Sequence, residues 1–137
     1  MAYQQIDHTA DVGLKITADS AAALFSEAAK GMFSLIVSGP ATGAIETRDI
    51  HAQAGDWEGL LVAWLRELLY LWHSENRWFC DMVTASVTTH AVTATVRLDT
   101  FNPTIHVICS EIKAVTYHQI AVEADGAQWT ARVIFDV

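Results

Sequence analysis

Apolar and polar residues alternate with a period of two in several stretches of the chain, as expected for strands with one buried face. In residues 12–18, Val12, Leu14 and Ile16 fall on one face, and small or polar residues fall on the other. A further strand precedes this one, at residues 3–7. The same pattern, together with the turn signals between the segments, predicts later strands at residues 45–54, 83–88, 92–98, 112–123 and 128–137.

Two other stretches follow helical spacing. Asp19 and Ser20 are suitable N-caps for a helix over residues 21–36, and we expect Gly39-Pro40 to end it. Asp56 caps a second helix over residues 57–74. Its apolar stripe is wide enough to predict burial on more than one side, although Trp64 or Trp72 could instead reach a partner surface.

Turn signals separate the later strands. Asp125-Gly126 is the strongest hairpin signal in the chain, residues 89–91 predict another turn, and Asn102-Pro103 opens a loop. Two helices among hairpin-linked strands indicate the α+β class. We expect a single domain over residues 1–137, built from a mostly antiparallel sheet with the two main helices packed on one face.

Composition narrows the function classes. The chain has 137 residues, is 52% hydrophobic and carries a formal charge of -8. A protein that binds an extended phosphate backbone relies on clustered Lys and Arg, so this acidity argues against that class. Acidity suits a basic protein partner or cations, and it could also serve solubility alone.

Several other classes lack their sequence signals. Cys80 and Cys109 are far apart, so neither a disulfide framework nor a zinc site is indicated, and we expect both to be buried free thiols. The amino-terminal residues do not resemble a signal peptide, and no apolar run approaches the roughly 20 residues of a membrane span. A soluble cytoplasmic protein is expected. The chain also lacks a nucleophile elbow, a P-loop and a zinc-binding HExxH pair, so no catalytic residue is predicted.

Carboxylates near the two ends of the chain suggest a site for a hard cation. Asp11 stands where the first strand region gives way to the second, and Asp136 ends the last strand, followed by the carboxylate of Val137. If the first and last strands are sheet neighbours, these three groups converge, and their mutual repulsion favours a bound cation. Asp11 could equally be a turn former and Asp136 a solvated strand end.

Two further polar segments could carry chemistry. Residues 8–11 are expected to bend or bulge, since His8 and Asp11 would face opposite sides of a regular strand. In residues 113–118, Lys113 and Tyr117 would share one face, and Thr116 and His118 the other. A polar and aromatic mixture on both faces suggests a cleft or an interface, but a plain edge strand fits the pattern equally well.

The order and spacing of these strings resemble the archease family over essentially the whole chain. The resemblance rests on Asp7-His8-Thr9-Ala10-Asp11, residues 23–29, residues 60–71, Glu111-Ile112-Lys113-Ala114-Val115-Thr116-Tyr117-His118 and Val133-Ile134-Phe135-Asp136-Val137. This chain departs from the common family pattern at Ala63, Arg66 and Asn102, none of which belongs to the expected cation site.

What the resemblance implies is a non-enzymatic activator of an RtcB-type RNA ligase, which joins RNA ends in tRNA splicing and RNA repair. Such a helper promotes the guanylylation of the ligase and its multiple turnover. The family's metal site would map onto Asp11, Asp136 and Val137, with Ca²⁺ as the expected divalent cation. The partner is then a protein, and we expect neither membrane association nor direct sequence-specific binding of nucleic acid.

Two alternatives remain open at the level of sequence. One is a small metal-dependent hydrolase that uses His8 or His118 as its general base. The other is a general chaperone or adaptor that presents the tryptophan-rich helix to its partners.

Overall fold

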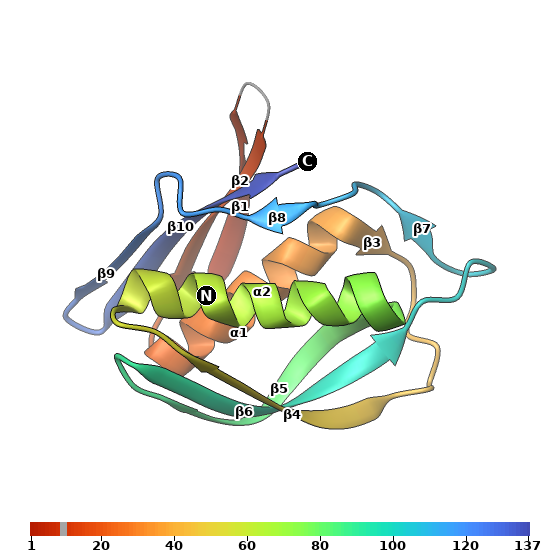
Figure 1. The fold of residues 1–137 in the computed structure, drawn as a ribbon, viewed down its shortest axis with the longest axis horizontal. Helices are drawn as coiled ribbons and strands as arrows, with labels where there is room; N and C mark the ends of the chain where they lie inside the picture. Colours follow the sequence, from red (N-terminus) through yellow and green to blue (C-terminus); the bar gives the residue numbers. More distant parts are fainter. Residues whose placement is uncertain (9–10) are drawn as a thin grey trace.

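The strands form three antiparallel sheets, and two helices lie among them (Figure 1). The computed structural model describes the backbone of residues 1–8 and 11–137, and the side chains of these residues except Asp7 and His8. The predicted bend at residues 8–11 therefore lies partly outside the described residues. The predicted α+β class with mostly antiparallel pairing is confirmed.

The first sheet joins strands from both ends of the chain. It has five strands in the order β1-β2-β10-β8, and β9 also pairs with β10. These strands are β1 (Ala2–His8), β2 (Asp11–Ala18), β8 (Ala114–Val115), β9 (Ala121–Asp125) and β10 (Gln128–Asp136).

The other two sheets come from the middle of the chain. One has the order β4-β6-β5, and the other pairs only β3 with β7. Their strands are β3 (Val37–Ser38), β4 (Glu46–Gln53), β5 (Arg77–Val87), β6 (Ala91–Thr100) and β7 (Val107–Ile108).

Both helices begin where their capping residues predict. α1 (Ala21–Ile36) starts after Ser20, whose hydroxyl accepts a hydrogen bond from the Ala23 amide at 3.1 Å. α2 (Trp57–Glu75) starts after Asp56, whose carboxylate accepts from the Gly59 amide at 2.7 Å. α1 ends at Ile36, as predicted, but Gly39-Pro40 does not end it. Val37 already takes an extended conformation and pairs in β3, two residues before Gly39.

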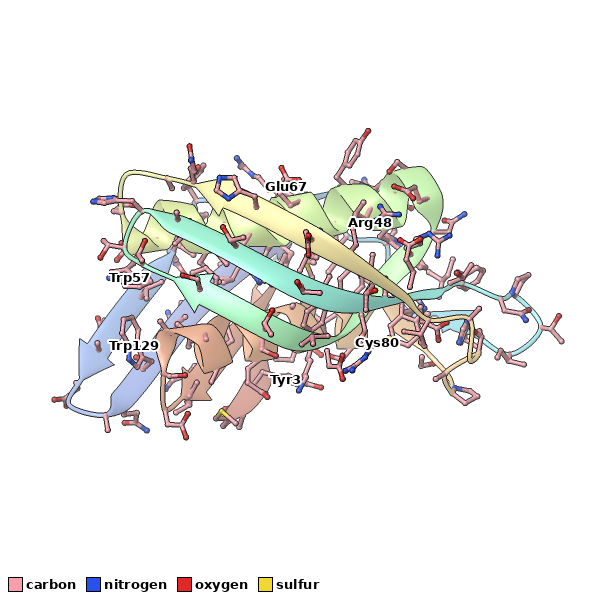
Figure 2. The ribbon with its side chains drawn as sticks, turned by 90° about the horizontal axis from the view of Figure 1, so that it is seen from below. Tyr3, Arg48, Trp57, Glu67, Cys80 and Trp129 are labelled. Carbon is pink, nitrogen blue, oxygen red and sulfur yellow. The ribbon has the colours of Figure 1, made fainter. Side chains whose placement is uncertain are left out.

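The helices pack between two sheets rather than on one face of a single sheet. α1 contacts both β2 and β5, while α2 contacts β4, β5 and β8. This arrangement explains the wide apolar stripe of α2, because sheets lie on more than one side of the helix. Figure 2 shows α2 above the β4-β6-β5 sheet, with Trp57 at one end of the helix near Trp129 of β10.

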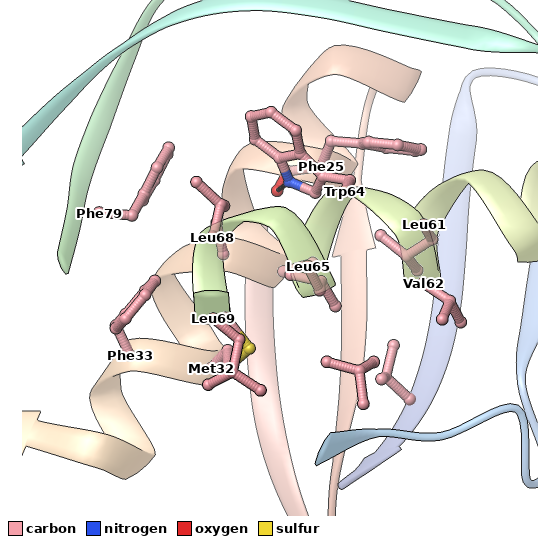
Figure 3. Packing of buried hydrophobic residues seen from close by; sticks show 14 of the residues in the cluster. Phe25, Met32, Phe33, Leu61, Val62, Trp64, Leu65, Leu68, Leu69 and Phe79 are labelled. Atoms are coloured by element: carbon pink, nitrogen blue, oxygen red, sulfur yellow. Dashed lines mark hydrogen bonds between the residues drawn. The ribbon is translucent and has the colours of Figure 1, made fainter. Parts of the chain in front are cut away.

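Trp64 of α2 lies at the centre of the core (Figure 3). Its indole N–H donates to the Phe25 carbonyl at 3.0 Å, which joins the two helices, and its ring packs against the rings of Phe25 and Phe79. The side chains of Trp64 and Trp72 are only 0% and 8% exposed. The predicted burial of α2 on more than one side is therefore confirmed, and the alternative that either tryptophan reaches a partner surface is wrong, because the second sheet covers that side of α2.

Residues 112–123 do not form the single predicted strand. β8 contains only Ala114 and Val115, and the chain then turns, with Gln119 in the left-handed conformation at φ 54°. The hydroxyl and amide of Thr116 both bond to the Ile134 carbonyl of β10. The predicted common face of Lys113 and Tyr117 therefore does not exist as a strand face, because the turn interrupts the alternation.

The cysteines are also less buried than predicted. Both are free thiols, but Cys80 is half-buried and Cys109 is exposed. Cys109 lies directly after the short strand β7, whose two residues are themselves exposed. Burial raises the pKa of the Cys80 thiol to about 11, with a further contribution from the charges of Asp99 and Asp81.

A buried carboxylate anchors the loop after α1. Asp99 is fully buried and accepts hydrogen bonds from the hydroxyl and the amide of Thr42, the latter at 2.9 Å, and from the Thr100 amide at 2.8 Å. Burial raises the pKa of Asp99, but these hydrogen bonds and the nearby His106 outweigh that effect and lower the pKa below its ordinary value. The ionised carboxylate is therefore the form that the fold stabilises.

We expect Trp64→Phe to lower the free energy of unfolding by about 1–3 kcal/mol, because the indole hydrogen bond to the Phe25 carbonyl is lost and the smaller ring fills the core less completely. Trp64→Ala should cost about 3–5 kcal/mol through the added cavity. Urea denaturation measures both changes, with Tyr70→Phe on the exposed face of α2 as the control. A loss for Trp64→Phe no larger than that of the control would contradict the prediction.

Stability should depend on Asp99 only where its carboxylate is ionised. Because folding lowers the pKa of Asp99, its contribution is present above the unfolded value, near 3.8, and is lost as the pH falls through the folded value. The difference in unfolding free energy between wild type and Asp99→Asn should be constant above about pH 5 and should shrink below about pH 4. Urea titrations at several pH values measure this difference, and a difference that grows in acid would refute the prediction.

Candidate divalent-cation site

Asp11 and Asp136 lie directly opposite each other in the first sheet. β2 pairs antiparallel with β10, and the register places Asp11 across from Asp136, Gly13 from Ile134 and Lys15 from Arg132. The sequence left open whether the first and last strands are neighbours. β10 pairs with the second strand, β2, and not with β1, and it is this pairing that brings Asp11 and Asp136 together. Opposed residues of an antiparallel pair point to the same face, with Cβ atoms roughly 4.5–5.5 Å apart.

The face that carries these carboxylates also carries opposed positive charges. Lys15 and Arg132 are four residues along each strand from the Asp11–Asp136 pair, a separation of roughly 13 Å. Between the two pairs, Ile134 lies over Gly13 so closely that an added Cβ would be 2.8 Å from its Cδ1 atom. The outer face of β2 and β10 thus runs from an acidic end, across an apolar step, to a basic end.

Asp136 is also held from its other side by β8. Its carbonyl accepts a hydrogen bond from the Lys113 amide at 2.8 Å, and Ala114 lies opposite it in the register. Asp136 is exposed, Asp11 is half-buried, and Val137 is 47% exposed. The backbone of this corner is therefore bonded in place while the Asp136 carboxylate remains accessible.

The donor chemistry of this corner fits a hard divalent cation, but its donor number is low. Ca²⁺ and Mg²⁺ prefer oxygen ligands such as carboxylates, and Ca²⁺ takes six to eight oxygen atoms in total. Within residues 1–8 and 11–137, apart from the two side chains not described, no three His, Cys, Asp or Glu side chains gather as a metal site. Asp11 and Asp136 could thus supply only part of a coordination shell, and the set that includes Val137 stays a prediction.

The histidines named as possible bases differ in their surroundings. The backbone of His8 lies opposite Asp11 in the β1–β2 register, but its side chain is outside the described part of the structure. His118 is exposed, and its amide donates to the Thr116 hydroxyl at 3.2 Å. The structure thus places His8 in the strand beside the carboxylate pair and His118 in the turn after β8.

Arg66, which the sequence marked only as a departure from the family pattern, lies between α2 and β8. Its Nε and Nη2 groups donate to the Val115 carbonyl at 3.2 and 3.0 Å, and its guanidinium lies 4.8 Å from the centre of the Tyr117 ring. About two helical turns further on, His73 donates from Nε2 to the Ile112 carbonyl at 2.9 Å. Arg66 and His73 thus both bond to the segment around β8, which in turn bonds to Asp136. The sequence signal that could have identified Arg66 is a cation on an otherwise apolar helix.

Comparison with known proteins gives consistent matches over the full chain. Residues 3–137 match the model of the Archease protein family (MTH1598/TM1083). The chain is 32% identical to the protein named archease of Methanopyrus kandleri, covering 100% of both chains. It is 30% identical to that of Methanosarcina mazei, covering 98% of this chain and 95% of the relative.

Two solved structures share the fold. The solution structure of Methanobacterium thermoautotrophicum protein 1598 has a TM-score of 0.78 at 24% identity and covers 99% of each chain. A crystal structure from Thermotoga maritima, described as an archease and possible chaperone, has a TM-score of 0.65 at 22% identity, covering 98% of this chain and 96% of that one. No helix in the described part of the chain is long and apolar enough to cross a membrane.

Arg66→Met should loosen the segment around β8, because the Val115 carbonyl loses both guanidinium donors. Hydrogen exchange of the Lys113 and Thr116 amides, which bond to β10, should become about tenfold faster. Arg97→Met, which removes an exposed guanidinium on β6, is the control. Unchanged exchange at both amides would show that Arg66 does not hold this segment.

Proposed function

This chain belongs to the archease family, and on that basis we propose that it activates an RtcB-type RNA ligase as a non-enzymatic protein cofactor. Its role would be to promote guanylylation and multiple turnover of the ligase in tRNA splicing or RNA repair. The observation that carries the proposal is the opposition of Asp11 and Asp136 at an accessible corner of the first sheet. We place this activity in the cytoplasm.

The cation site is proposed as an incomplete one. Asp11, Asp136 and the carboxyl group of Val137 would hold a divalent cation, with Ca²⁺ as the expected ion. Three anionic groups would leave several coordination positions for water or for oxygen atoms of a partner. A shell of this kind suits a cation that is shared with, or delivered to, the active site of another protein.

Activation would then work through contact with the ligase. The charge of -8 favours association with a partner that is basic near its nucleic-acid site. Activation requires that the protein bind the productive conformation of the ligase more tightly than the unproductive one, because only differential binding shifts a population. The alternative of a chaperone or adaptor that presents the tryptophan-rich helix has less support, because Trp64 and Trp72 are buried.

The test is ligation by a purified RtcB-type ligase under multiple turnover, with this protein added in wild-type form or as Asp11→Asn or Asp136→Asn. We expect both variants to lose most of the acceleration. Ca²⁺ should raise the melting temperature of the wild type but not of either variant, because a ligand that binds only the folded state stabilises it. A variant with a glycine added after Val137, which displaces the carboxyl group, should behave in the same way.

Asp125→Asn provides the matched control, because it removes the same charge from the exposed β9–β10 hairpin. It should retain both the acceleration and the response to Ca²⁺. Full acceleration by Asp11→Asn and Asp136→Asn would refute the cation mechanism. Hydrolysis of phosphoesters by this protein alone would instead favour the hydrolase alternative with His8 or His118 as the base.

A further inference from the structure

The positively charged side chains divide into two groups. Of the eight Lys and Arg residues, four form ion pairs with carboxylates: Lys30, Arg48, Arg77 and Arg97. In the part of the chain that the structure describes, no carboxylate pairs with the other four, which are Lys15, Arg66, Lys113 and Arg132. Lys15 lies on β2 and Arg132 on β10, whereas Arg66 and Lys113 lie where α2 meets β8.

Two of these unpaired cations share a pocket between α2 and β8. The pocket has a volume of about 220 Å³ and is lined by Arg66, Leu69, Tyr70, His73, Lys113, Ala114 and Val115. No carboxylate belongs to this lining, although acidic residues outnumber basic ones two to one in the chain. Its floor includes the buried Leu69 side chain, which is 4% exposed. The pocket is therefore a local concentration of positive charge on an acidic protein.

Exposed aromatic rings accompany the cations. Tyr70, which lines the pocket, is 65% exposed, and Tyr117, which stacks on the Arg66 guanidinium, is 57% exposed. Tyr70 lies one helical turn from Arg66, so the two side chains are neighbours on the surface of α2. An open aromatic face beside a cation is the combination that binds a nucleobase and its phosphate in single-stranded nucleic acids.

The principal cation is held in position before any ligand binds. Arg66 is oriented by the Val115 carbonyl and by the Tyr117 ring, and these contacts leave its Nη1 group without an acceptor in the described structure. A guanidinium held in this way loses little side-chain freedom when it binds an anion. The backbone of Lys113 is fixed by its hydrogen bond to Asp136, whereas its side chain is flexible. The Lys113 ammonium can therefore contact the same ligand as Arg66.

We propose that the α2–β8 pocket binds one nucleotide, with its phosphate between Arg66 and Lys113 and its base stacked on Tyr70 or Tyr117. An acidic peptide would satisfy the cations but would leave two exposed aromatic rings unused, so a nucleotide fits the surface better. Only two Lys or Arg side chains, Arg66 and Lys113, line the pocket, so the contact extends to one or two phosphates. Stacking tolerates every base, so the site carries no sequence preference.

The pocket and the carboxylate pair are linked through the backbone, because the Lys113 amide donates to the Asp136 carbonyl. The inference goes beyond the proposed ligase activation and does not depend on it, since binding is measured on this protein alone without added divalent cation.

Titration of the ¹⁵N-labelled protein with adenosine 5′-monophosphate, followed by NMR, tests the inference. We expect saturable shifts confined to the amides of α2 and β8 around Tyr70, Lys113 and Val115. Tyr70→Ala and Lys113→Gln should each weaken the affinity about tenfold, as expected for the loss of one stacking platform or one charge contact. Neither side chain makes a hydrogen bond or ion pair in the described structure, so both variants should keep the fold.

Lys15→Gln is the matched control, since it removes an equally unpaired lysine from the first sheet and should leave the affinity unchanged. Tighter binding of a single-stranded pentaadenylate would identify an RNA strand as the source of the nucleotide, and equal binding a free nucleotide; either result supports the site. The inference is overturned if no localised shifts occur or if Lys15→Gln weakens binding as much as Lys113→Gln. It also fails if inorganic phosphate or a pentaglutamate peptide binds as tightly as the nucleotide.

Discussion

The antiparallel pairing of β2 with β10 is the interaction on which the rest of the structure depends. It joins the second strand to the last, so the chain closes on itself across more than one hundred residues. On the inner face, the same register brings Leu14 opposite Val133, and both side chains are completely buried. On the outer face it brings Asp11 opposite Asp136. One set of backbone hydrogen bonds therefore builds both part of the core and the candidate cation site, and a shift by one residue would invert both faces.

The position of the helices explains why the candidate sites lie at the first sheet. α1 and α2 fill the space between this sheet and β4-β6-β5, and Trp64 joins the two helices through the Phe25 carbonyl (Figure 3). This packing buries the large apolar side chains of α2. What α2 leaves for contact with other molecules is its polar stripe, where Arg66, Tyr70 and His73 meet the segment around β8.

Charge shows why a whole-chain value says little about a local surface. A formal charge of -8 argues against a protein that binds an extended phosphate backbone. Four cations are nevertheless neutralised by ion pairs elsewhere, and Arg66 and Lys113 converge on one pocket without a carboxylate. The acidic corner and the basic pocket are thus separate sites, linked by the hydrogen bond between the Lys113 amide and the Asp136 carbonyl.

The sequence by itself determined the local elements, because their signals are short in range. Ser20 and Asp56 cap their helices through contacts within three residues, and the Asp125-Gly126 turn, with Gly126 at φ 62°, forms where the dipeptide predicts it. The sequence also indicated Asp11 and Asp136 as candidates, but only on the condition that their strands were neighbours.

Tertiary structure decided the rest, because it depends on contacts between distant residues. Periodicity could not show that a second sheet would bury Trp64 and Trp72, nor that the chain would turn after Val115 to bond with β10. It could not pair Arg66 with a carbonyl 49 residues away or place Lys113 beside it. A pattern along the chain specifies which face of an element is apolar, whereas which element covers that face, and which side chains meet at its edge, is determined only when the sheets assemble.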